Sequence, residues 1–221
     1  MLITSLMACL FLNFDINKKL IRGGIIMKVE NLKVYNKALI VVDMVNGFVK
    51  EGVLHDDNIA RVIPRQIELI REYQNVGELV IFIQDTHTKE STEHKRFPNY
   101  HCLKGSGEEE VVDELKPFTL FNNTICIPKN NTSFMESESF RDVMEEAVNI
   151  KEFDIVGCCT DICICNGPMG LACYLDEHNR DSVIRVHRDA VATFAEDDRQ
   201  NYVEAAYLLM EQQGIQLVKK F

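Results

Sequence analysis

The chain has 221 residues, of which 46% are hydrophobic and 26% are charged, and its formal net charge is -10 with a pI near 5.1. This length and composition are typical of a folded protein with one large core, which excludes a disordered chain. The acidic balance argues against a nucleic-acid partner, because binding to phosphates needs clustered Lys and Arg.

The first 26 residues are unlike the rest of the chain. Their apolar run, "MLITSLMACLFL", is 12 residues long, which is too short to cross a bilayer. It also lacks the basic leader and the small-residue cleavage site of a signal peptide. We therefore expect translation to start at Met27, with residues 1–26 a non-native or disordered extension and residues 27–221 a single domain. No membrane partner is expected.

From residue 37 onward, apolar and β-branched runs alternate with segments of helical apolar spacing. Such runs predict buried strands, and the spacing predicts helices between them. Strands separated by helices of this length predict a three-layer α/β/α fold around a six-stranded, mostly parallel, doubly wound (Rossmann-like) sheet. The expected strands are 37–44, 78–84, 124–129, 152–157, 182–188 and 215–219, and the expected helices are 56–77, 137–150, 161–178 and 198–213.

The segment from Asp85 to Pro117 is too long for a simple connector, and such loops are usually functional. We expect one short helix within it, because Ser106 and Glu109 have the spacing of a capping box and Pro117 ends the run. A parallel sheet carries its ligand site at the carboxyl ends of the strands. That rule selects Asp43, Asp85, His87, Lys129 and the stretch "GCCTDICIC" at 157–165 as candidate site residues.

The stretch 157–165 holds four of the eight cysteines of the chain. A structural zinc site would need a second pair of cysteines further on, and none is obvious. A redox pair would have C-x-x-C spacing, whereas the spacings here differ. No secretory context supports disulfides, so we expect reduced thiols in a cytosolic protein.

A third interpretation is a single reactive thiol. If Thr160 or Asp161 caps the helix that follows the strand, Cys163 falls in the first helical turn. Backbone N–H groups and the helix dipole would then stabilise a thiolate and lower its pKa. Cys165 and Cys173 would point elsewhere. The competing interpretation is that Cys163 is a small buried hydrophobic residue, which position alone does not exclude.

Three segments together resemble the signatures of a known family. "ALIVVDMVNGF" with Asp43, "IPKNNTSF" with Lys129 and "VGCCTDICI" with Cys163 are similar to those of the isochorismatase-like cysteine hydrolases, in the same order and at the same strand ends. The resemblance runs from about Lys37 to the C-terminus. It implies the isochorismatase-like hydrolase fold within the predicted α/β class.

The resemblance also implies a catalytic mechanism. Lys129 would stabilise the Cys163 thiolate, and Asp43 would take the thiol proton and later deliver it to the leaving ammonia. Cys163 would attack an amide carbonyl and form a thioester that water hydrolyses. The backbone N–H groups of Cys159 and Cys163 would form the oxyanion hole, with a cis peptide bond between Cys158 and Cys159.

The long segment contains a candidate metal site. Asp85 and His87 are two residues apart, so at an extended strand end their side chains point the same way. Histidine with carboxylate suits zinc, iron or manganese, although a polar surface loop with three histidines is the alternative. The stretch resembles the metal loop of nicotinamidases (pyrazinamidases), which implies Asp85, His87 and His101 as ligands. Glu93 or His94 would be the fourth, and we prefer Glu93 for its distance from Phe97.

The resemblance implies a cytoplasmic amidase of NAD salvage and pyridine nucleotide biosynthesis that hydrolyses nicotinamide to nicotinate and ammonia. One divalent ion would orient the pyridine ring in a small pocket walled by Phe48 and Phe97. Two alternatives remain open: another hydrolase of the family, acting on a ureido- or maleamate-type amide or on isochorismate, and a non-catalytic thiol or metal sensor. The expected partner is a small amide substrate, and a homo-oligomer is left open.

Overall fold

The computed structural model of the chain describes residues 19–20, 26–27, 31–97, 99–196 and 198–219. The expected extension at residues 1–26 lies almost wholly outside these residues and stays a prediction. Within the described chain, no helix has the length and apolar character needed to span a membrane. A short antiparallel pair, β1 (Lys19–Leu20) with β2 (Ile26–Met27), precedes the main sheet.

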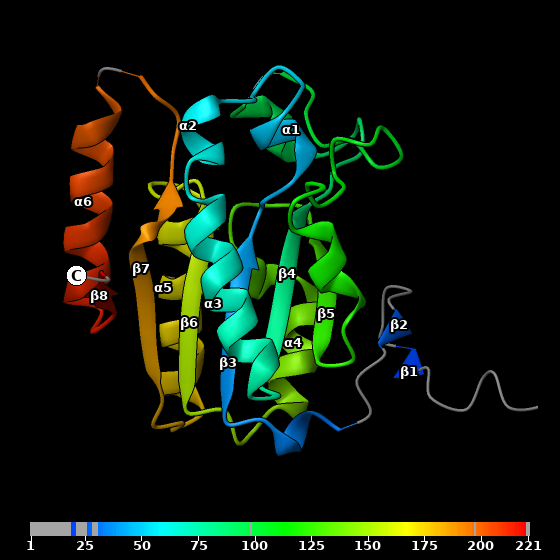
Figure 1. The fold of residues 1–221 in the computed structure, drawn as a ribbon. Helices are drawn as coiled ribbons and strands as arrows, with labels where there is room; N and C mark the ends of the chain where they lie inside the picture. Colours follow the sequence, from blue (N-terminus) through cyan, green and yellow to red (C-terminus); the bar gives the residue numbers. More distant parts are fainter. Residues whose placement is uncertain (1–18, 21–25, 28–30, 98, 197, 220–221) are drawn as a thin grey trace, which may run out of the picture.

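The main sheet has six strands in the order β5-β4-β3-β6-β7-β8, and every neighbouring pair is parallel (Figure 1). Its strands are β3 (Lys37–Val42), β4 (Leu79–Asp85), β5 (Thr124–Lys129), β6 (Glu152–Cys158), β7 (Val183–Ala192) and β8 (Gln216–Val218). The α-helices are α1 (Asn46–Val49), α2 (Asp57–Ala60), α3 (Ile63–Asn75), α4 (Glu138–Glu146), α5 (Cys163–Glu177) and α6 (Arg199–Gln212). The predicted fold class is confirmed.

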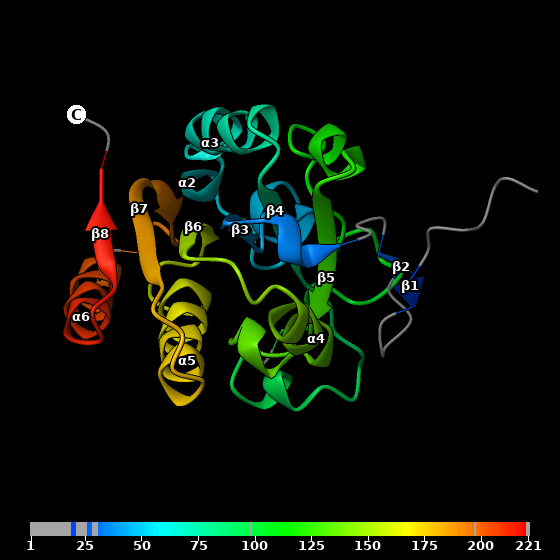
Figure 2. The same ribbon diagram turned by 90° about the horizontal axis from the view of Figure 1, so that it is seen from below.

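Helices cover both faces of the sheet, as Figure 2 shows: α2 and α3 lie on one side, and α4, α5 and α6 lie on the other. Successive side chains of a strand point to opposite faces, so β3 contributes to two cores at once. Leu39 and Val41 pack into the core under α3, whereas Ile40 and Val42 pack into the core on the α5 side. This double burial explains why the strands are continuous apolar runs.

The strands lie close to their predicted positions, and two helical predictions differ from the structure. The expected helix 56–77 is two helices, α2 and α3, and Pro64 stands in the first turn of α3, where it begins a helix rather than continuing one. The expected capping-box helix after Ser106 is absent from this described loop. Gly105 and Gly107 there have φ of 82° and 92°, which no helix accommodates.

The strand order reverses direction between β3 and β6, which is where an open α/β sheet forms a ligand crevice. These two strands approach closely beside the crevice at Gly157, whose φ is 126°. A Cβ atom at this position would lie 2.0 Å from the carbonyl oxygen of Val42. Only glycine therefore fits here.

Candidate active site

The triad of acid, lysine and cysteine comes together at the carboxyl edge of the sheet. Asp43 directly follows β3, Lys129 is the last residue of β5, and Cys163 is the first residue of α5. Asp43 has a φ of 55°, in the left-handed region that Asp tolerates better than most residues. The peptide bond between Cys158 and Cys159 is cis.

Lys129 is at the centre of this group. Its Nζ lies 2.9 Å from Asp43 Oδ2, 2.7 Å from Asp85 Oδ1 and 3.6 Å from Cys163 Sγ. The position of Asp85 follows from the strand pairing, because Asp85 of β4 is in register with Lys129 of β5. All four side chains are buried, so one cation is shared by two carboxylates and a thiol in a largely buried site.

Burial and these charges set the protonation of the triad. Burial raises the pKa of Asp43 to about 6, with the charge of Asp85 adding to the rise and Lys129 opposing it. Burial alone would lower the pKa of Lys129, but Asp43 and Asp85 raise it well above its ordinary value. At neutral pH the site therefore holds a charged lysine and two ionised carboxylates.

The thiol differs from the sequence-based expectation. Burial raises the pKa of Cys163 well above its ordinary value, and although Lys129 lowers it, Asp43 and Asp85 raise it further. The expected cap is also absent, because the N-cap residue is Ile162, which makes no side-chain capping bond. Because the positive charge of Lys129 is already shared by two carboxylates, the resting thiol keeps its proton. Asp43, ionised beside it, is the group able to accept that proton.

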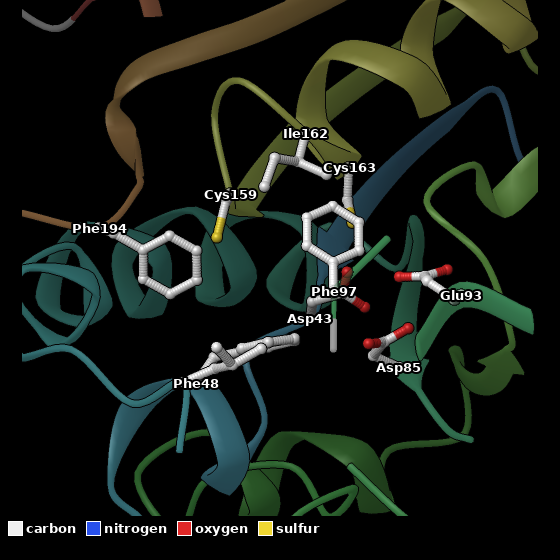
Figure 3. Close-up of a pocket in the computed structure, with 10 residues that line it drawn as sticks. Asp43, Phe48, Asp85, Glu93, Phe97, Cys159, Ile162, Cys163 and Phe194 are labelled. Atoms are coloured by element: carbon white, nitrogen blue, oxygen red, sulfur yellow. The ribbon is translucent and has the colours of Figure 1, made fainter. Parts of the chain in front are cut away.

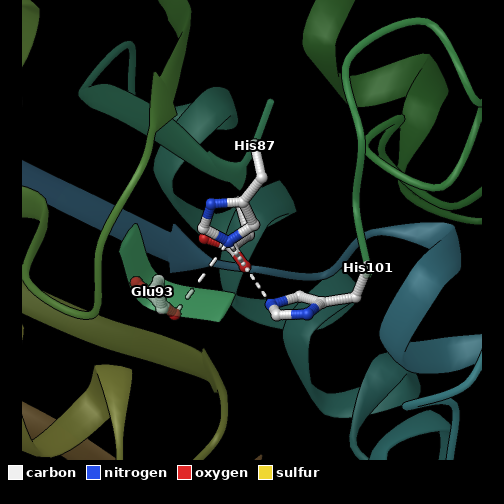
Figure 4. A group of neighbouring side chains, drawn as sticks. His87, Glu93 and His101 are labelled. Carbon is white, nitrogen blue, oxygen red and sulfur yellow. Dashed lines mark hydrogen bonds and ion pairs between the residues drawn. The ribbon is translucent and has the colours of Figure 1, made fainter. Parts of the chain in front are cut away.

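A second cluster lies next to the triad, and its Asp85 pairs with Lys129. Figure 4 shows its three other members, His87, Glu93 and His101. Ligand atoms of four buried residues lie within 4.8 Å of one another: Asp85, His87, Glu93 and His101. Asp85 Oδ2 is 2.9 Å from His87 Nε2 and 3.5 Å from His101 Nε2. Burial alone would raise the pKa of Asp85, but Lys129 and the two imidazoles hold it well below its ordinary range.

The groups around the cluster prepare it for a cation. His87 Nδ1 donates to Asn130 Oδ1 at 2.8 Å, and His101 Nδ1 donates to the Asn99 carbonyl at 2.8 Å. Both imidazoles therefore turn Nε2 toward Asp85, and a bound cation would replace the proton that Nε2 donates to this carboxylate, as in metal-binding histidines. Glu93 Oε2 is buried without a hydrogen-bond partner among the described residues, so a cation would satisfy it. These residues fit a divalent metal ion.

The two candidates for the fourth ligand lie in different surroundings. Glu93 belongs to the cluster, whereas His94 Nε2 lies 3.1 Å from the carbonyl oxygen of Thr88. His101 also belongs to the cluster.

The thiol and the acidic cluster open on one pocket, which holds about 340 Å³ of empty space. Figure 3 shows Asp85 and Glu93 at one end of it, with Phe48 and Phe97 beside the middle. Cys163 and Asp43 are also among its lining residues. Neither the N–H of Cys159 nor that of Cys163 donates to a backbone carbonyl in the described turns and caps. Both are therefore available to a substrate oxygen.

A comparison with known protein families identifies the family of this chain. The family model for the isochorismatase domain matches residues 37–218. The chain belongs to the isochorismatase family. The fold and the family that the sequence predicted are both confirmed, and the protein is an isochorismatase-family hydrolase.

Several individual proteins are similar to this chain. An uncharacterized isochorismatase family protein of Bacillus subtilis, PncA, is 29% identical over 173 residues, covering 73% of this chain and 88% of the relative. Nicotinamidase 1 of Arabidopsis thaliana is 31% identical over 140 residues, covering 57% of this chain and 56% of that protein. The crystal structure of nicotinamidase PncA from Bacillus subtilis superposes with a TM-score of 0.68 at 25% identity, covering 83% and 99% of the two chains.

Several residues of this hydrolase site are not among those that the sequence predicted. Leu54, Ile162 and Phe194 also line the pocket, and Asn130 supports His87. Asn130 directly follows β5, so the strand-end rule could have found it. Phe194 also follows a strand, β7, but that strand extends beyond its predicted end at residue 188. Leu54 lies in a loop with no sequence signal of its own.

Proposed function

We propose that this isochorismatase-family hydrolase hydrolyses nicotinamide to nicotinate and ammonia. The observation that supports this proposal is that Cys163 and Asp43 line the same pocket as Asp85 and Glu93 of the metal-type cluster, and that Lys129 pairs with both aspartates. A substrate held by its ring at the cluster would reach the thiol with its carboxamide. The chain's likeness to nicotinamidases agrees with this arrangement.

Each residue of the triad has a role in the proposed reaction. Asp43 takes the thiol proton while Cys163 Sγ bonds to the carboxamide carbon, and Lys129 stabilises the sulfur as it gains charge. The N–H groups of Cys159 and Cys163 bind the oxygen that becomes negative. Asp43 then gives its proton to the departing ammonia, which leaves a thioester. Water, activated by Asp43, cleaves the thioester and releases nicotinate and the thiol.

The remaining residues hold the ring. Phe48 and Phe97 provide flat apolar surfaces, on which an aromatic ring stacks. Asp85, His87, Glu93 and His101 would hold one divalent ion, and their mixed imidazole and carboxylate set suits zinc, iron or manganese. When bound, this ion supplies a Lewis acid for the pyridine nitrogen.

The apolar rings of the pocket favour an aromatic amide over the alternative substrates. The charged side chains among its described lining residues are three carboxylates, those of Asp43, Asp85 and Glu93. Lys129 pairs with two of them, and a divalent ion at the cluster would offset the charge further, so charge alone does not select the substrate. Maleamate and isochorismate have no aromatic ring that could stack on Phe48 and Phe97. An amidase for an aromatic amide therefore fits the pocket best.

Comparing nicotinamide with benzamide tests the proposal. Benzamide has the same carboxamide but no ring nitrogen, so we expect a far lower kcat/KM for it. Chelation should remove activity, and added zinc, iron or manganese should restore it. Equal kcat/KM values for the two amides, or full activity of a metal-free preparation, would refute the proposed role of the cluster.

Metal content gives a second readout that does not depend on activity. His87→Ala should bind less than one equivalent of metal, because one imidazole is a large share of four protein ligands. His94→Ala is the matched control, since its ring lies 5.2 Å from that of His87 but outside the cluster. A loss of metal in the control and not in His87→Ala would contradict the assigned ligand set.

A further inference from the structure

Phe194 closes the end of the pocket that lies opposite the acidic cluster. Figure 3 shows its ring across the pocket from Asp85 and Glu93, beside Cys159. It follows directly after β7, two residues beyond the last strand residue, Ala192. This end of the pocket is therefore bounded by an aromatic ring, and the opposite end by carboxylates.

The backbone on both sides of Phe194 is held in place. The carbonyl oxygen of Thr193 accepts a hydrogen bond from Asn58 Nδ2 at 2.8 Å. The N–H of Ala195 donates to Asp56 Oδ2, also at 2.8 Å. Asp56 and Asn58 belong to the start of α2, so the segment that carries Phe194 is joined to a neighbouring element on each side. The backbone that carries the ring is therefore hydrogen-bonded on both sides.

A charged side chain also supports the ring. The guanidinium carbon of Arg199 lies 5.2 Å from the centre of the Phe194 ring, within the range of a cation–π contact. Arg199 also donates from Nη1 to Asp161 Oδ2 at 2.9 Å, and Thr193 Oγ1 donates to the other carboxylate oxygen. Asp161 stands between Cys159 and Cys163 in the chain. The wall at Phe194 and the turn that carries the nucleophile therefore form one connected unit.

We propose that Phe194 is a specificity-determining residue that limits the size of the substrate ring on the side away from the metal-type cluster. The inference rests on the proposed function, in which the cluster holds the ring nitrogen and Cys163 meets the carboxamide. Those two attachments fix the ring in its plane, so a substituent that points toward Phe194 has no room to move aside. A pocket distinguishes substrates that differ by one methyl-sized group by about 10- to 200-fold.

The test is a comparison of nicotinamide with its four ring-methylated derivatives, which carry the methyl group at each free carbon in turn. In the wild type, at least one derivative whose methyl points away from the ring nitrogen should have a kcat/KM at least about 10-fold below that of nicotinamide. Phe194→Ala should raise the kcat/KM of that derivative, relative to nicotinamide, by a similar factor. Derivatives with the methyl beside the ring nitrogen should not gain, because that side faces the cluster.

Tyr202→Ala is the matched control. The Tyr202 ring lies 5.9 Å from the same guanidinium carbon of Arg199, but it is exposed and does not line the pocket. This variant should keep the wild-type order of preference across the five amides. If Phe194→Ala fails to fold, Phe194→Leu, which keeps an apolar side chain while shortening it, takes its place.

The outcomes separate this inference from the function on which it rests. A wild-type enzyme that does not hydrolyse nicotinamide refutes the proposed function, and the inference fails with it. A wild-type enzyme that hydrolyses nicotinamide, with unchanged relative kcat/KM values in Phe194→Ala, refutes only the inference. A change of the same size in Tyr202→Ala also overturns it, because the effect would then arise from Arg199 and not from the pocket wall.

Discussion

Replacing Asp43 by Asn should remove the proposed catalytic base and should raise the free energy of unfolding, relative to that of the wild type, more at high pH than at low pH. Burial raises the pKa of Asp43 from 3.8 to about 6, and each pKa unit corresponds to about 1.4 kcal/mol. An acid whose pKa is raised on folding contributes its stability at low pH and loses it as the pH rises. Ionised Asp43 therefore costs the wild-type fold about 3 kcal/mol at pH 8 and about 1 kcal/mol at pH 4.5.

Asn keeps the shape of the side chain and removes this cost. Oδ1 of Asp43 has no hydrogen-bond partner in the described structure, so the new amide group can lose about 1–3 kcal/mol of hydrogen bonding at any pH. This loss is the same at both pH values, so it cancels when the two are compared. We expect the free energy of unfolding of Asp43→Asn, relative to that of the wild type, to be about 2 kcal/mol higher at pH 8 than at pH 4.5.

Urea denaturation of both proteins at the two pH values measures this difference. Asp154→Asn is the matched control. Burial alone would raise the pKa of Asp154, but His187 at 2.6 Å and a hydrogen bond from Tyr73 lower it. Ionised Asp154 therefore contributes its stability above the unfolded pKa of 3.8, so that variant should change the stability by nearly the same amount at pH 8 and at pH 4.5. If Asp43→Asn differs from the wild type equally at both pH values, the raised pKa is wrong. Turnover of Asp43→Asn should fall about 10²–10⁴-fold.

Three further predictions concern the triad. Cys163→Ala should abolish turnover without unfolding the protein, whereas Cys165→Ala and Cys173→Ala should keep substantial activity. Near-wild-type turnover of Cys163→Ala would exclude the thioester mechanism. Loss of activity in all three variants would favour a structural or sensing role for the cysteines. Lys129→Met should raise the thiol pKa further, because it removes the adjacent cation, and the pH profile of iodoacetamide labelling measures this shift; an unchanged profile counts against Lys129. In the wild type, kcat/KM should fall about tenfold per pH unit below pH 6, because protonated Asp43 accepts no proton. A rate that stays flat down to pH 5 contradicts that assignment.

Much of the site could be predicted because it lies at strand ends. Asp43, Asp85 and Lys129 each follow or end an apolar run, and the parallel pairing that such runs predict brings their carboxyl ends to one edge. For the cysteines at 157–165, position alone did not distinguish Cys163 from its neighbours. The prediction that Cys163 is the reactive thiol came from the order of the three segments, which resembles that of a known family.

What could not be predicted depends on contacts across the fold. The pKa of Cys163 is raised first by burial and then by the two carboxylates that share the charge of Lys129. Both causes are known only once the strands are paired. The Ser106–Glu109 pattern failed for a different reason. Glu109 accepts from the N–H groups of Gly105 and Gly107, so its carboxylate closes a loop instead of capping a helix.

The reversal of strand order between β3 and β6 has a consequence for how the enzyme acquires its activity during folding. The aspartate after β3 and the cysteine after β6 become neighbours only when these two strands pair in parallel, although a long stretch of chain separates them. Parallel pairing needs crossover connections and closes large loops, so such contacts form slowly compared with local helices. Helical circular dichroism should therefore recover before amidase activity during refolding, and a chain released from the ribosome before β6 emerges has no catalytic site.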